Sequence, residues 1–482
     1  MSASGPAPSG DLTSGPILAT LITFAMPTLA SNVLQSLNGS INAIWVGRIL
    51  GESALAATAN ANIIMFMVFS AAFGFGMAAT VKVGQSFGAR DVDAARRMVG
   101  TALGFCGALG LIVGVAGWFG SPALLRALGT PGDSFALALA YLRVTCVAVP
   151  IAVVSVVVTM SLRGAGDART PLYVMILTVA LDIVLNPLLI LGVGPLPRLG
   201  IAGSALASAL ASLAGLIAAL AYVYGRDLPL RLRGSELGYL IPRREELGYI
   251  IAKGLPMGAQ MLLMAAAGII MIGLVNREGL LTTAAYSATQ QLWTYVQMPA
   301  MAVSAAVSAM AAQSIGAGRW DRLGSITKAG IITNVALTGT LVAITVLLDR
   351  PALALFLGPD SPAVPIAARI QLLSSWSFIL FGVTMCLFGT MRANGVVLAP
   401  MFILAISMYP ARLGFYAVGY PIIGADAIWL AFPAGSLVAM VLAALAYRRK
   451  GWRAPPRGTT PAEAAEESQA DGEPAGRIAP SV

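Results

Sequence analysis

Long apolar segments recur along almost the whole chain and constrain its fold more than any other feature. A helix of about 20 residues crosses a hydrocarbon core of about 30 Å. By this criterion we expect twelve spans, at 16–44, 53–82, 94–118, 134–162, 171–194, 200–225, 246–275, 281–310, 323–348, 362–391, 397–418 and 423–447. Since 57% of the residues are hydrophobic and only 11% are charged, an ordinary soluble domain is excluded. The sequence predicts an all-α polytopic membrane protein.

Basic residues are distributed unequally between the loops on the two sides of the predicted spans. One side carries twenty-two Lys and Arg residues and the other side carries five. The positive-inside rule therefore predicts that both termini are cytoplasmic, in a multi-pass protein of a bacterial-type inner membrane. The same loops account for the net charge of +9 through contact with anionic headgroups of the lipid bilayer, and no nucleic acid partner is needed to explain it.

The chain repeats itself at an offset of 228 to 229 residues. The matched segments are QSFGARDVD at 85–93 with QSIGAGRWD at 313–321, and LRGAGDARTP at 162–171 with MRANGVVLAP at 391–400. Each half contains an even number of predicted spans, so both halves enter the membrane in the same orientation. Parallel repeats of this kind are a known transporter architecture, with the substrate path between the halves. We therefore expect two six-helix lobes related by a parallel internal repeat.

This repeat sets the expected domain boundaries. The N-terminal lobe covers 16–225 and the C-terminal lobe covers 246–447, joined by a cytoplasmic linker at 226–245. A polar lead-in occupies 1–15. Residues 448–482 are rich in Pro, Ala and acidic residues and contain few large apolar groups, so we expect a disordered cytoplasmic tail.

Two prolines occupy equivalent positions in the first helix of each half. Pro27 aligns with Pro256 at the offset of the repeat. A proline frees a backbone carbonyl and permits a helix to bend. Proline is common in membrane helices, but its presence at equivalent positions favours a role in helix bending.

A single acid, Asp182, lies inside a predicted span, in the segment LDIVLNPLLI. Such a carboxylate is costly in a membrane and usually serves an ion path or a proton relay. Asn186 follows one helical turn later and lies on the same face. The first span carries a polar stripe formed by Asn32, Gln35, Asn38 and Asn42. We expect Asp182, Asn186, Asn42 and Asn38 to form an ion-coupling site.

Two coupling ions fit this group of residues. A lone carboxyl in surroundings of low dielectric can bind and release a proton near neutral pH. Alternatively, Na⁺ could bind the carboxylate together with the amide oxygens of Asn186 and Asn42. A purely structural role, in which Asp182 holds helices together through hydrogen bonds, is the remaining alternative. We favour H⁺ over Na⁺, and we expect no cofactor because the chain has no histidine and its three cysteines match no metal or redox spacing.

A second polar stripe follows the eighth span and suggests a substrate cavity. It consists of Tyr286, Gln290, Trp293 and Gln297, at spacings of 4, 3 and 4. Aromatic faces attract organic cations, and amides adapt to several hydrogen-bonding patterns. We add Gln35 of the first span and Met261 of the seventh span, since Met packs adaptably against varied ligands. Ordinary helix packing with an interfacial aromatic near the span end is the alternative interpretation of this stripe, and contact with lipid or the core is the alternative for Met261.

These features together resemble the multidrug and toxic compound extrusion (MATE) family of secondary transporters. The resemblance covers about residues 16 to 447 and rests on the paired prolines, the Q-S-x-G-A loops, the segment RGAGDARTP at 163–171, and the N-P of LDIVLNP followed by the glycine-rich LGVGPLPRLGIAG. It implies two six-helix lobes around a central cavity. It also implies the export of large, often cationic and aromatic, compounds in exchange for Na⁺ or H⁺.

The chain departs from the family at the expected ion site. MATE proteins commonly have Asp on the first helix where the segment INAIWVG places Asn42, and DIVLNP reverses the usual order of amide and acid on the fifth helix. The carboxylate has thus moved one turn along the same face. Members coupled through the second lobe carry acids on their seventh and tenth helices, and this chain has none there. The resemblance therefore places ion coupling in the first lobe.

The sequence as a whole predicts a cation-coupled antiporter that exports organic small molecules by alternating access and is not an enzyme. A flippase for a lipid-linked precursor is one alternative, and its cavity should be basic. A membrane-embedded transferase is less favoured, because such enzymes place acidic or histidine clusters at one membrane face. The major facilitator superfamily is disfavoured because GARDVDAARR does not match its usual loop. No obligate protein partner is evident.

Overall fold

The computed structural model describes residues 10–130, 132–192, 198–358, 360–449 and 451–453. The predicted disordered tail therefore lies almost entirely outside the described residues. Within the described ranges the chain is helical and contains no strand. The first half comprises α1 (Ile17–Leu50), α2 (Glu52–Gly88), α3 (Val92–Ala127), α4 (Gly132–Gly164), α5 (Arg169–Leu191) and α6 (Ile201–Gly225). A short 3-10 helix, η1 (Gly234–Leu240), lies in the segment that joins the halves.

The second half contains more breaks than the first. Its helices are α7 (Arg244–Asn276), α8 (Leu280–Val296), α9 (Met298–Gly316), α10 (Arg322–Leu347), α11 (Asp349–Leu357), α12 (Ala363–Ser374), α13 (Ser377–Ala393), α14 (Leu398–Ile406), the π-helical turn η2 (Ser407–Ala411), α15 (Arg412–Ile423), α16 (Asp426–Arg448) and the 3-10 turn η3 (Gly451–Arg453). The break between α8 and α9 falls at Gln297, and the two helices together form one apolar span.

The number of membrane spans agrees with the prediction. In the described residues, eleven helical segments are long and apolar enough to cross a membrane, and a twelfth span forms if α12 and α13 are counted together. These two helices meet at an angle of 40°. The predicted all-α polytopic fold is confirmed, including the division of the chain into two repeated halves.

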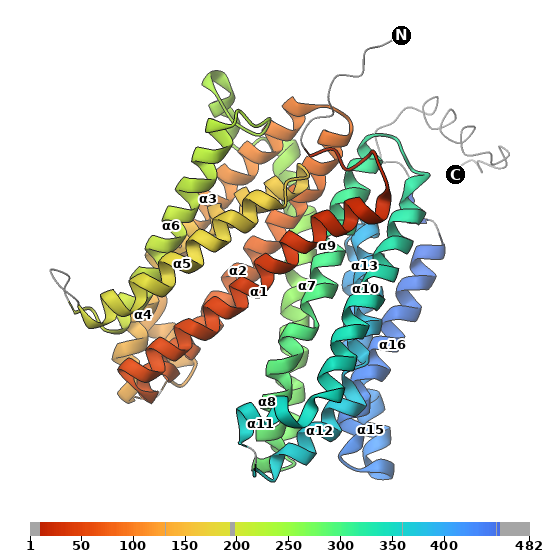
Figure 1. Ribbon diagram of the computed structural model, residues 1–482. Coiled ribbons are helices and arrows are strands. Elements are labelled where there is room, and N and C mark those ends of the chain that lie inside the picture. Colours follow the sequence, from red (N-terminus) through yellow and green to blue (C-terminus); the bar gives the residue numbers. More distant parts are fainter. Residues whose placement is uncertain (1–9, 131, 193–197, 359, 450, 454–482) are drawn as a thin grey trace, which may run out of the picture.

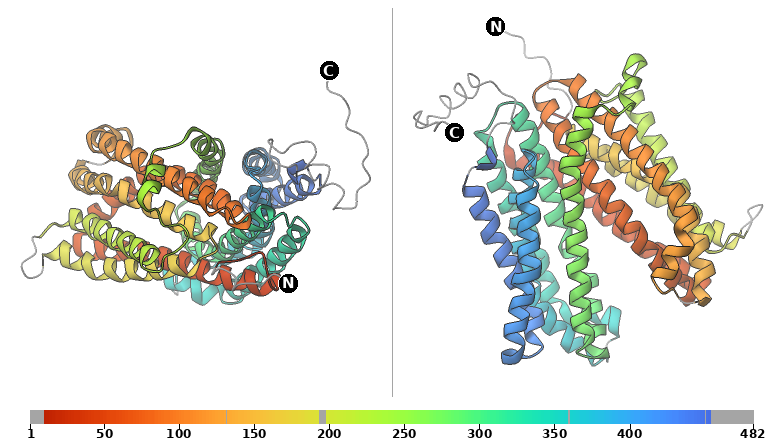
Figure 2. Two further views of the ribbon diagram at one scale, coloured as in Figure 1. Left: turned by 90° about the horizontal axis from the view of Figure 1, so that it is seen from above. Right: turned by 180° about the vertical axis from the view of Figure 1, so that it is seen from behind.

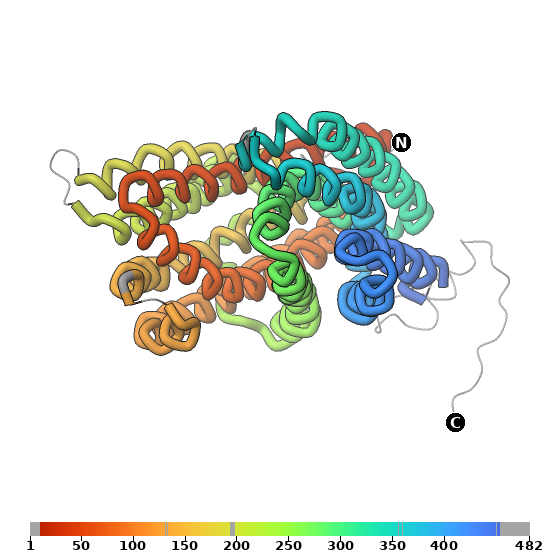
Figure 3. The backbone as a smooth tube through the Cα atoms, turned by 90° about the horizontal axis from the view of Figure 1, so that it is seen from below, coloured from red at the N-terminus to blue at the C-terminus, as the bar shows by residue number. Residues whose placement is uncertain are grey.

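The two halves form separate groups of helices that converge at one end and diverge toward the other (Figures 1 and 2). Both ends of the described chain lie at the converging end, which we call the closed end (Figure 1). α1 begins against α9 and α10 of the second half and also packs along α5 of its own half. Seen from the far end, α1 runs between α5 and α6 on one side and the other helices of the first half on the other, and its start reaches the second half (Figure 3). This helix therefore links the two groups.

The repeated Q-S-x-G-A motifs meet at the closed end as a reciprocal pair. The Gln85 side-chain nitrogen donates to the backbone oxygen of Ala393 at 2.7 Å, and that of Gln313 donates to the backbone oxygen of Gly164 at 3.2 Å. Ala393 and Gly164 are themselves equivalent positions of the repeat. Each glutamine thus satisfies a backbone carbonyl of the opposite half, which a buried backbone group requires.

The glycines of these motifs allow the two backbones to approach closely. A Cβ placed on Gly88 would lie 1.9 Å from the backbone oxygen of Gln313, and one on Gly316 would lie 1.8 Å from that of Gln85. Neither position can carry a side chain without separating the halves. The glycine of each motif is therefore needed for the close approach of the two backbones.

The first helix of each half is continuous, and the linker has contacts of its own. α1 and α7 continue without a break through Pro27 and Pro256. In the linker, the Tyr239 hydroxyl of η1 donates to Asp93 at 2.8 Å and Arg96 pairs with Glu236 at 2.6 Å. The linker is therefore fixed against α3.

Small residues also hold the helices of the first half together, as is usual in membranes. Gly110 and Gly114 of α3 form a G-x-x-x-G pair, and a Cβ on Gly114 would lie 2.6 Å from the backbone oxygen of Cys146 on α4. Close packing of this kind replaces the hydrophobic driving force, which is absent between helices in lipid.

We expect Gly114→Val to destabilise the protein by on the order of 1–3 kcal/mol, the usual cost of overpacking. The measurement is the apparent melting temperature in detergent, followed by size-exclusion chromatography after heating. Gly120→Val is the matched control on the same helix, since a Cβ there meets nothing within 4 Å. Equal melting temperatures for the two variants would contradict the close α3–α4 contact.

Candidate functional site

Asp182 lies at the centre of a buried polar cluster between α1, α5 and α6. It is 2% exposed, and one carboxylate oxygen accepts hydrogen bonds from the Asn38 amide of α1 at 2.9 Å. The other oxygen accepts from the Ser208 hydroxyl of α6 at 2.9 Å and from the Asn186 amide at 3.4 Å. Among the described residues none of the ion pairs involves Asp182. The carboxylate is therefore held by neutral donors alone.

Asn42 extends this cluster by one helical turn along α1. Its side-chain oxygen accepts from the Asn186 amide at 3.0 Å and from the Ser204 hydroxyl at 2.8 Å. Asn186 is 1% exposed and stands between Asp182 and Asn42. The four residues predicted for an ion-coupling site, Asp182, Asn186, Asn42 and Asn38, therefore lie in one hydrogen-bonded network.

The local sequence explains why the cluster forms. Asp182 and Asn186 are separated by four residues on α5, as are Asn38 and Asn42 on α1 and Ser204 and Ser208 on α6. Residues four apart lie on one face of a helix. Three polar faces of equal spacing then meet where α1, α5 and α6 pack on one another, and the buried Tyr141 of α4 adds a hydrogen bond with Asn42.

Two oxygen atoms in this cluster are left without a hydrogen bond. Within the described part of the chain, the side-chain oxygens of Asn38 and Asn186 are buried and have no donor. A buried acceptor without a partner is costly and calls for an explanation. Together with the carboxylate they form a set of oxygen atoms that a small hard cation, or a donated proton, could satisfy.

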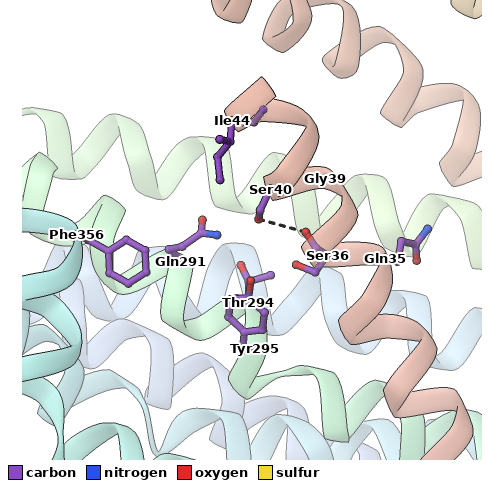
Figure 4. A pocket seen from close by; sticks show the side chains of 10 residues that line it. Gln35, Ser36, Gly39, Ser40, Ile44, Gln291, Thr294, Tyr295 and Phe356 are labelled. Atoms are coloured by element: carbon purple, nitrogen blue, oxygen red, sulfur yellow. Dashed lines mark hydrogen bonds between the residues drawn. The ribbon is translucent and has the colours of Figure 1, made fainter. Parts of the chain in front are cut away.

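A cavity of about 710 Å³ lies between the two halves, beside this cluster (Figure 4). Its wall on one side comes from α1 and on the other from α8 and α11. The lining residues are Gln35, Ser36, Gly39, Ser40, Ala43 and Ile44 of α1, Gln291, Thr294 and Tyr295 of α8, and Phe356 of α11. They supply amides, hydroxyls and aromatic rings. Their number and chemistry fit a bulky organic ligand.

α1 carries both the polar cluster and the cavity wall. Asn38 and Asn42 point to Asp182 and Asn186, whereas Gln35, which is exposed, lines the cavity together with neighbouring residues of the same helix. The two sites are therefore separated by the thickness of one helix. Any displacement of α1 that alters one site also alters the other.

The predicted wall on α8 differs from the observed one. Tyr286 and Trp293 are 2% and 5% exposed and pack inside the second half, where the Trp293 ring nitrogen donates to Gln371 at 2.9 Å. Gln290 donates to the Tyr286 hydroxyl at 3.1 Å. The physical reason is aromatic packing, because the rings of Trp293 and Phe432 lie 5.2 Å apart. The neighbouring face of α8 lines the cavity instead.

The two other predicted cavity residues also lie elsewhere. Gln297 lies at the junction of α8 and α9, and Met261 is half-buried on α7. Neither is among the residues that line the cavity. Of the six residues predicted for the substrate cavity, Gln35 is the one that the structure places at its wall.

Several residues of the two sites were missed from the sequence. Ser204 and Ser208 show the spacing of four that marks a polar face, and this spacing was a usable signal. Thr294 and Tyr295 face Ser36 and its neighbours across the cavity. No sequence pattern indicates this, because it depends on how the two halves are placed relative to each other.

Comparisons with known proteins agree with this architecture. A family model described as MatE matches the chain twice, at residues 27–188 and 256–418. The chain is 34% identical over 421 residues to the probable multidrug resistance protein YoeA of Bacillus subtilis, covering 87% of this chain and 91% of that protein. It is 30% identical over 448 residues to the probable multidrug resistance protein YpnP of the same organism, covering 92% and 98%.

A solved structure of MATE in complex with MaD3S has the same fold, with a TM-score of 0.85 at 21% identity over 92% of this chain and 98% of that chain. The twofold match of the family model corresponds to the two halves of the fold. The chain therefore belongs to the MatE family, the multidrug and toxic compound extrusion transporters.

Proposed function

We propose that this protein is a cation-coupled antiporter that exports organic, often cationic and aromatic, compounds by alternating access. The observation that carries the proposal is the position of α1 between the Asp182 cluster and the cavity. Coupling requires a structural element that responds to ion binding and also forms part of the substrate site. α1 meets both requirements. The names of the relatives as multidrug resistance proteins support export as the direction of transport.

The coupling would act through the hydrogen bonds of Asp182. Binding of a cation neutralises the carboxylate, so that the amide of Asn38 and the hydroxyl of Ser208 lose their charged acceptor. Hydrogen bonds to charged groups are stronger than neutral ones. The packing of α1 on α5 then changes, and with it the wall of the cavity. Ion binding and substrate binding would in this way oppose each other.

We propose H⁺ as the coupling ion, bound directly by the Asp182 carboxylate. Na⁺ is the second candidate, favoured by the unpartnered oxygens of Asn38 and Asn186. Oxygen atoms from one carboxylate and two amides are ligands that a hard cation accepts. The two candidates differ in one respect that can be measured, since H⁺ needs the carboxyl alone and Na⁺ needs the amide oxygens too.

The chemistry of the cavity wall supports an organic ligand over a lipid-linked precursor. The residues that line the cavity in the described part of the chain include no Lys or Arg, whereas a phosphate-bearing precursor calls for basic partners. Tyr295 and Phe356 offer aromatic faces for organic cations, and Gln35 and Gln291 offer adaptable amides. This set fits several bulky ligands of different shape.

We further propose that the closed end faces the cytoplasm. The basic loops lie there, since Arg319 and Arg322 contact residues 13 and 15 near the start of the described chain. The positive-inside rule supports cytoplasmic termini in this orientation, and we propose the inner membrane as the location of the protein. The structure then has its cavity between lobes that diverge away from the cytoplasm.

We expect Asp182→Asn to reduce coupled efflux by ~10-fold or more, since coupling free energies of 1–3 kcal/mol correspond to factors of this size. The measurement is dye efflux in proteoliposomes under a pH gradient or a Na⁺ gradient, each imposed alone. Asp360→Asn is the matched control, because Asp360 is an exposed acid of the second half. Efflux at the wild-type rate in Asp182→Asn would disprove the assignment.

The two ions are separated by the double variant Asn38→Leu with Asn186→Leu, which removes both free amide oxygens and keeps Asp182. Efflux driven by a Na⁺ gradient should be lost if Na⁺ is the coupling ion, because its ligands are gone. Efflux driven by a pH gradient should persist at a reduced rate if H⁺ is the ion. Wild-type efflux under both gradients would show that the amides take no part in coupling.

We expect Gly39→Trp to reduce efflux of large dyes more than that of small ones, by several-fold. A Cβ at Gly39 meets nothing within 4 Å, so the indole can occupy cavity volume without straining α1. Gly39→Ala is the control, with a small side chain at the same position. An equal loss for large and small dyes would argue against this cavity as the substrate site.

A further inference from the structure

Residues 10–15, which we call the N-terminal strap, lie folded across the closed end ahead of α1. The sequence suggests a polar lead-in here, yet Leu12 is 5% exposed and joins an apolar cluster with Ala168 and Val307. Ala168 belongs to the loop between α4 and α5, and Val307 belongs to α9. The strap therefore contacts both halves of the protein.

The strap is bound to the second half through backbone groups. The Leu12 nitrogen donates to the side-chain oxygen of Gln313 at 2.9 Å, and the Gln313 side-chain nitrogen donates to the Gly10 oxygen at 3.2 Å. The two hydrogen bonds clamp the strap onto the amide of one residue. Arg319 and Arg322 of the same half also donate to the Thr13 oxygen.

The strap meets the first half at the segment where Gln313 also binds. A Cβ on Gly10 would lie 2.5 Å from the Ala165 oxygen, and one on Gly166 would lie 2.0 Å from the Gly10 oxygen. Gln313 donates to the Gly164 oxygen in the same place. Two chain segments, one from the first half and one from the strap, thus converge on this glutamine of the second half.

Asp11 keeps the strap in its folded shape. Its carboxylate accepts from the Thr13 nitrogen at 2.8 Å and from the Ser14 hydroxyl at 2.8 Å. Burial opposes ionisation of this group, but these hydrogen bonds and the charge of Arg322 hold the pKa of Asp11 below its usual value. Asp11 is therefore charged at neutral pH, and the turn it stabilises persists.

The repeat itself does not require the strap. At the equivalent position of the first half, the described contacts of the Gln85 side chain comprise one donated hydrogen bond, to Ala393. The segment that corresponds to the strap by the offset of the repeat begins at Tyr239. It packs on α3, since a Cβ on Gly100 would lie 2.6 Å from the Tyr239 side chain. The strap thus reinforces only one of the two glutamine contacts.

We propose that the N-terminal strap is a built-in lock that stabilises the protein with its closed end shut. Its contacts with Ala165, Gly166 and Gln313 can all exist only while the two halves meet there. A contact made in only one conformational state shifts the population toward that state. The lock needs alternating access between two states, as in the proposed function, but depends on neither the ion nor the substrate.

The test uses two reporter cysteines, examined separately in purified full-length protein in lipid nanodiscs. Ser314→Cys reports on the closed end, because Ser314 is fully buried. Ala43→Cys reports on the cavity wall. The native cysteines are buried, and their labelling is subtracted. The rate of modification by a charged maleimide is measured with no ion gradient and no substrate, so that the result does not depend on transport.

The lock is removed in two ways, each with a matched control. Gly10→Val introduces a side chain where the Ala165 oxygen leaves no room, and Gly238→Val places the same group in open space in η1. Deletion of residues 2–12 removes the part of the strap that holds Gln313, and deletion of residues 2–9 leaves it.

We expect Gly10→Val and the longer deletion to raise labelling at Ser314→Cys by about fivefold, the effect of losing one modest interaction. Labelling at Ala43→Cys should fall, whereas the controls should label as the parent proteins do. Opposite changes at the two reporters distinguish a shift of state from unfolding, which would raise both. Unchanged labelling at Ser314→Cys, or a rise at both reporters, would overturn the proposal.

Discussion

Direct contact between two backbones at the closed end is the constraint on which the rest of the structure depends. Gln85 and Gln313 each bind a carbonyl of the opposite half, and Gly88 and Gly316 allow the approach. Because the halves are joined at this end, their other ends can diverge and leave a cavity between α1 and α8. The same arrangement leaves α1 with one face against its own half and another against the cavity.

The fold could be predicted almost completely from the sequence, because each helix must satisfy its backbone internally and bury its apolar surface in lipid or protein. The spans, the parallel repeat and the Asp182 cluster followed from length, offset and a spacing of four residues. The face of α8 that lines the cavity did not follow. Tyr286 and Trp293 look suited to a ligand, yet the aromatic rings of α16 provide a better partner inside the second half.

The strap was missed for a related reason. Apart from Leu12 its residues are polar or small, and composition alone suggests a solvated segment. What binds it is the pair of amide atoms on Gln313 and the absence of a side chain on Gly10 and Gly166. Backbone recognition of this kind leaves little trace in hydropathy. Sequence patterns identify which surfaces are apolar, but they do not identify which carbonyls remain available at the end of a helix.

The strap is attached to α1 by Pro16, directly before the first residue of that helix. A segment tethered so closely to its binding site has an effective concentration in the millimolar range or above. After each release it rebinds without searching through solution, so that even a weak interaction is re-formed quickly. Under the proposed lock, the time for which the closed end stays open depends on how far α1 carries the strap from Gln313.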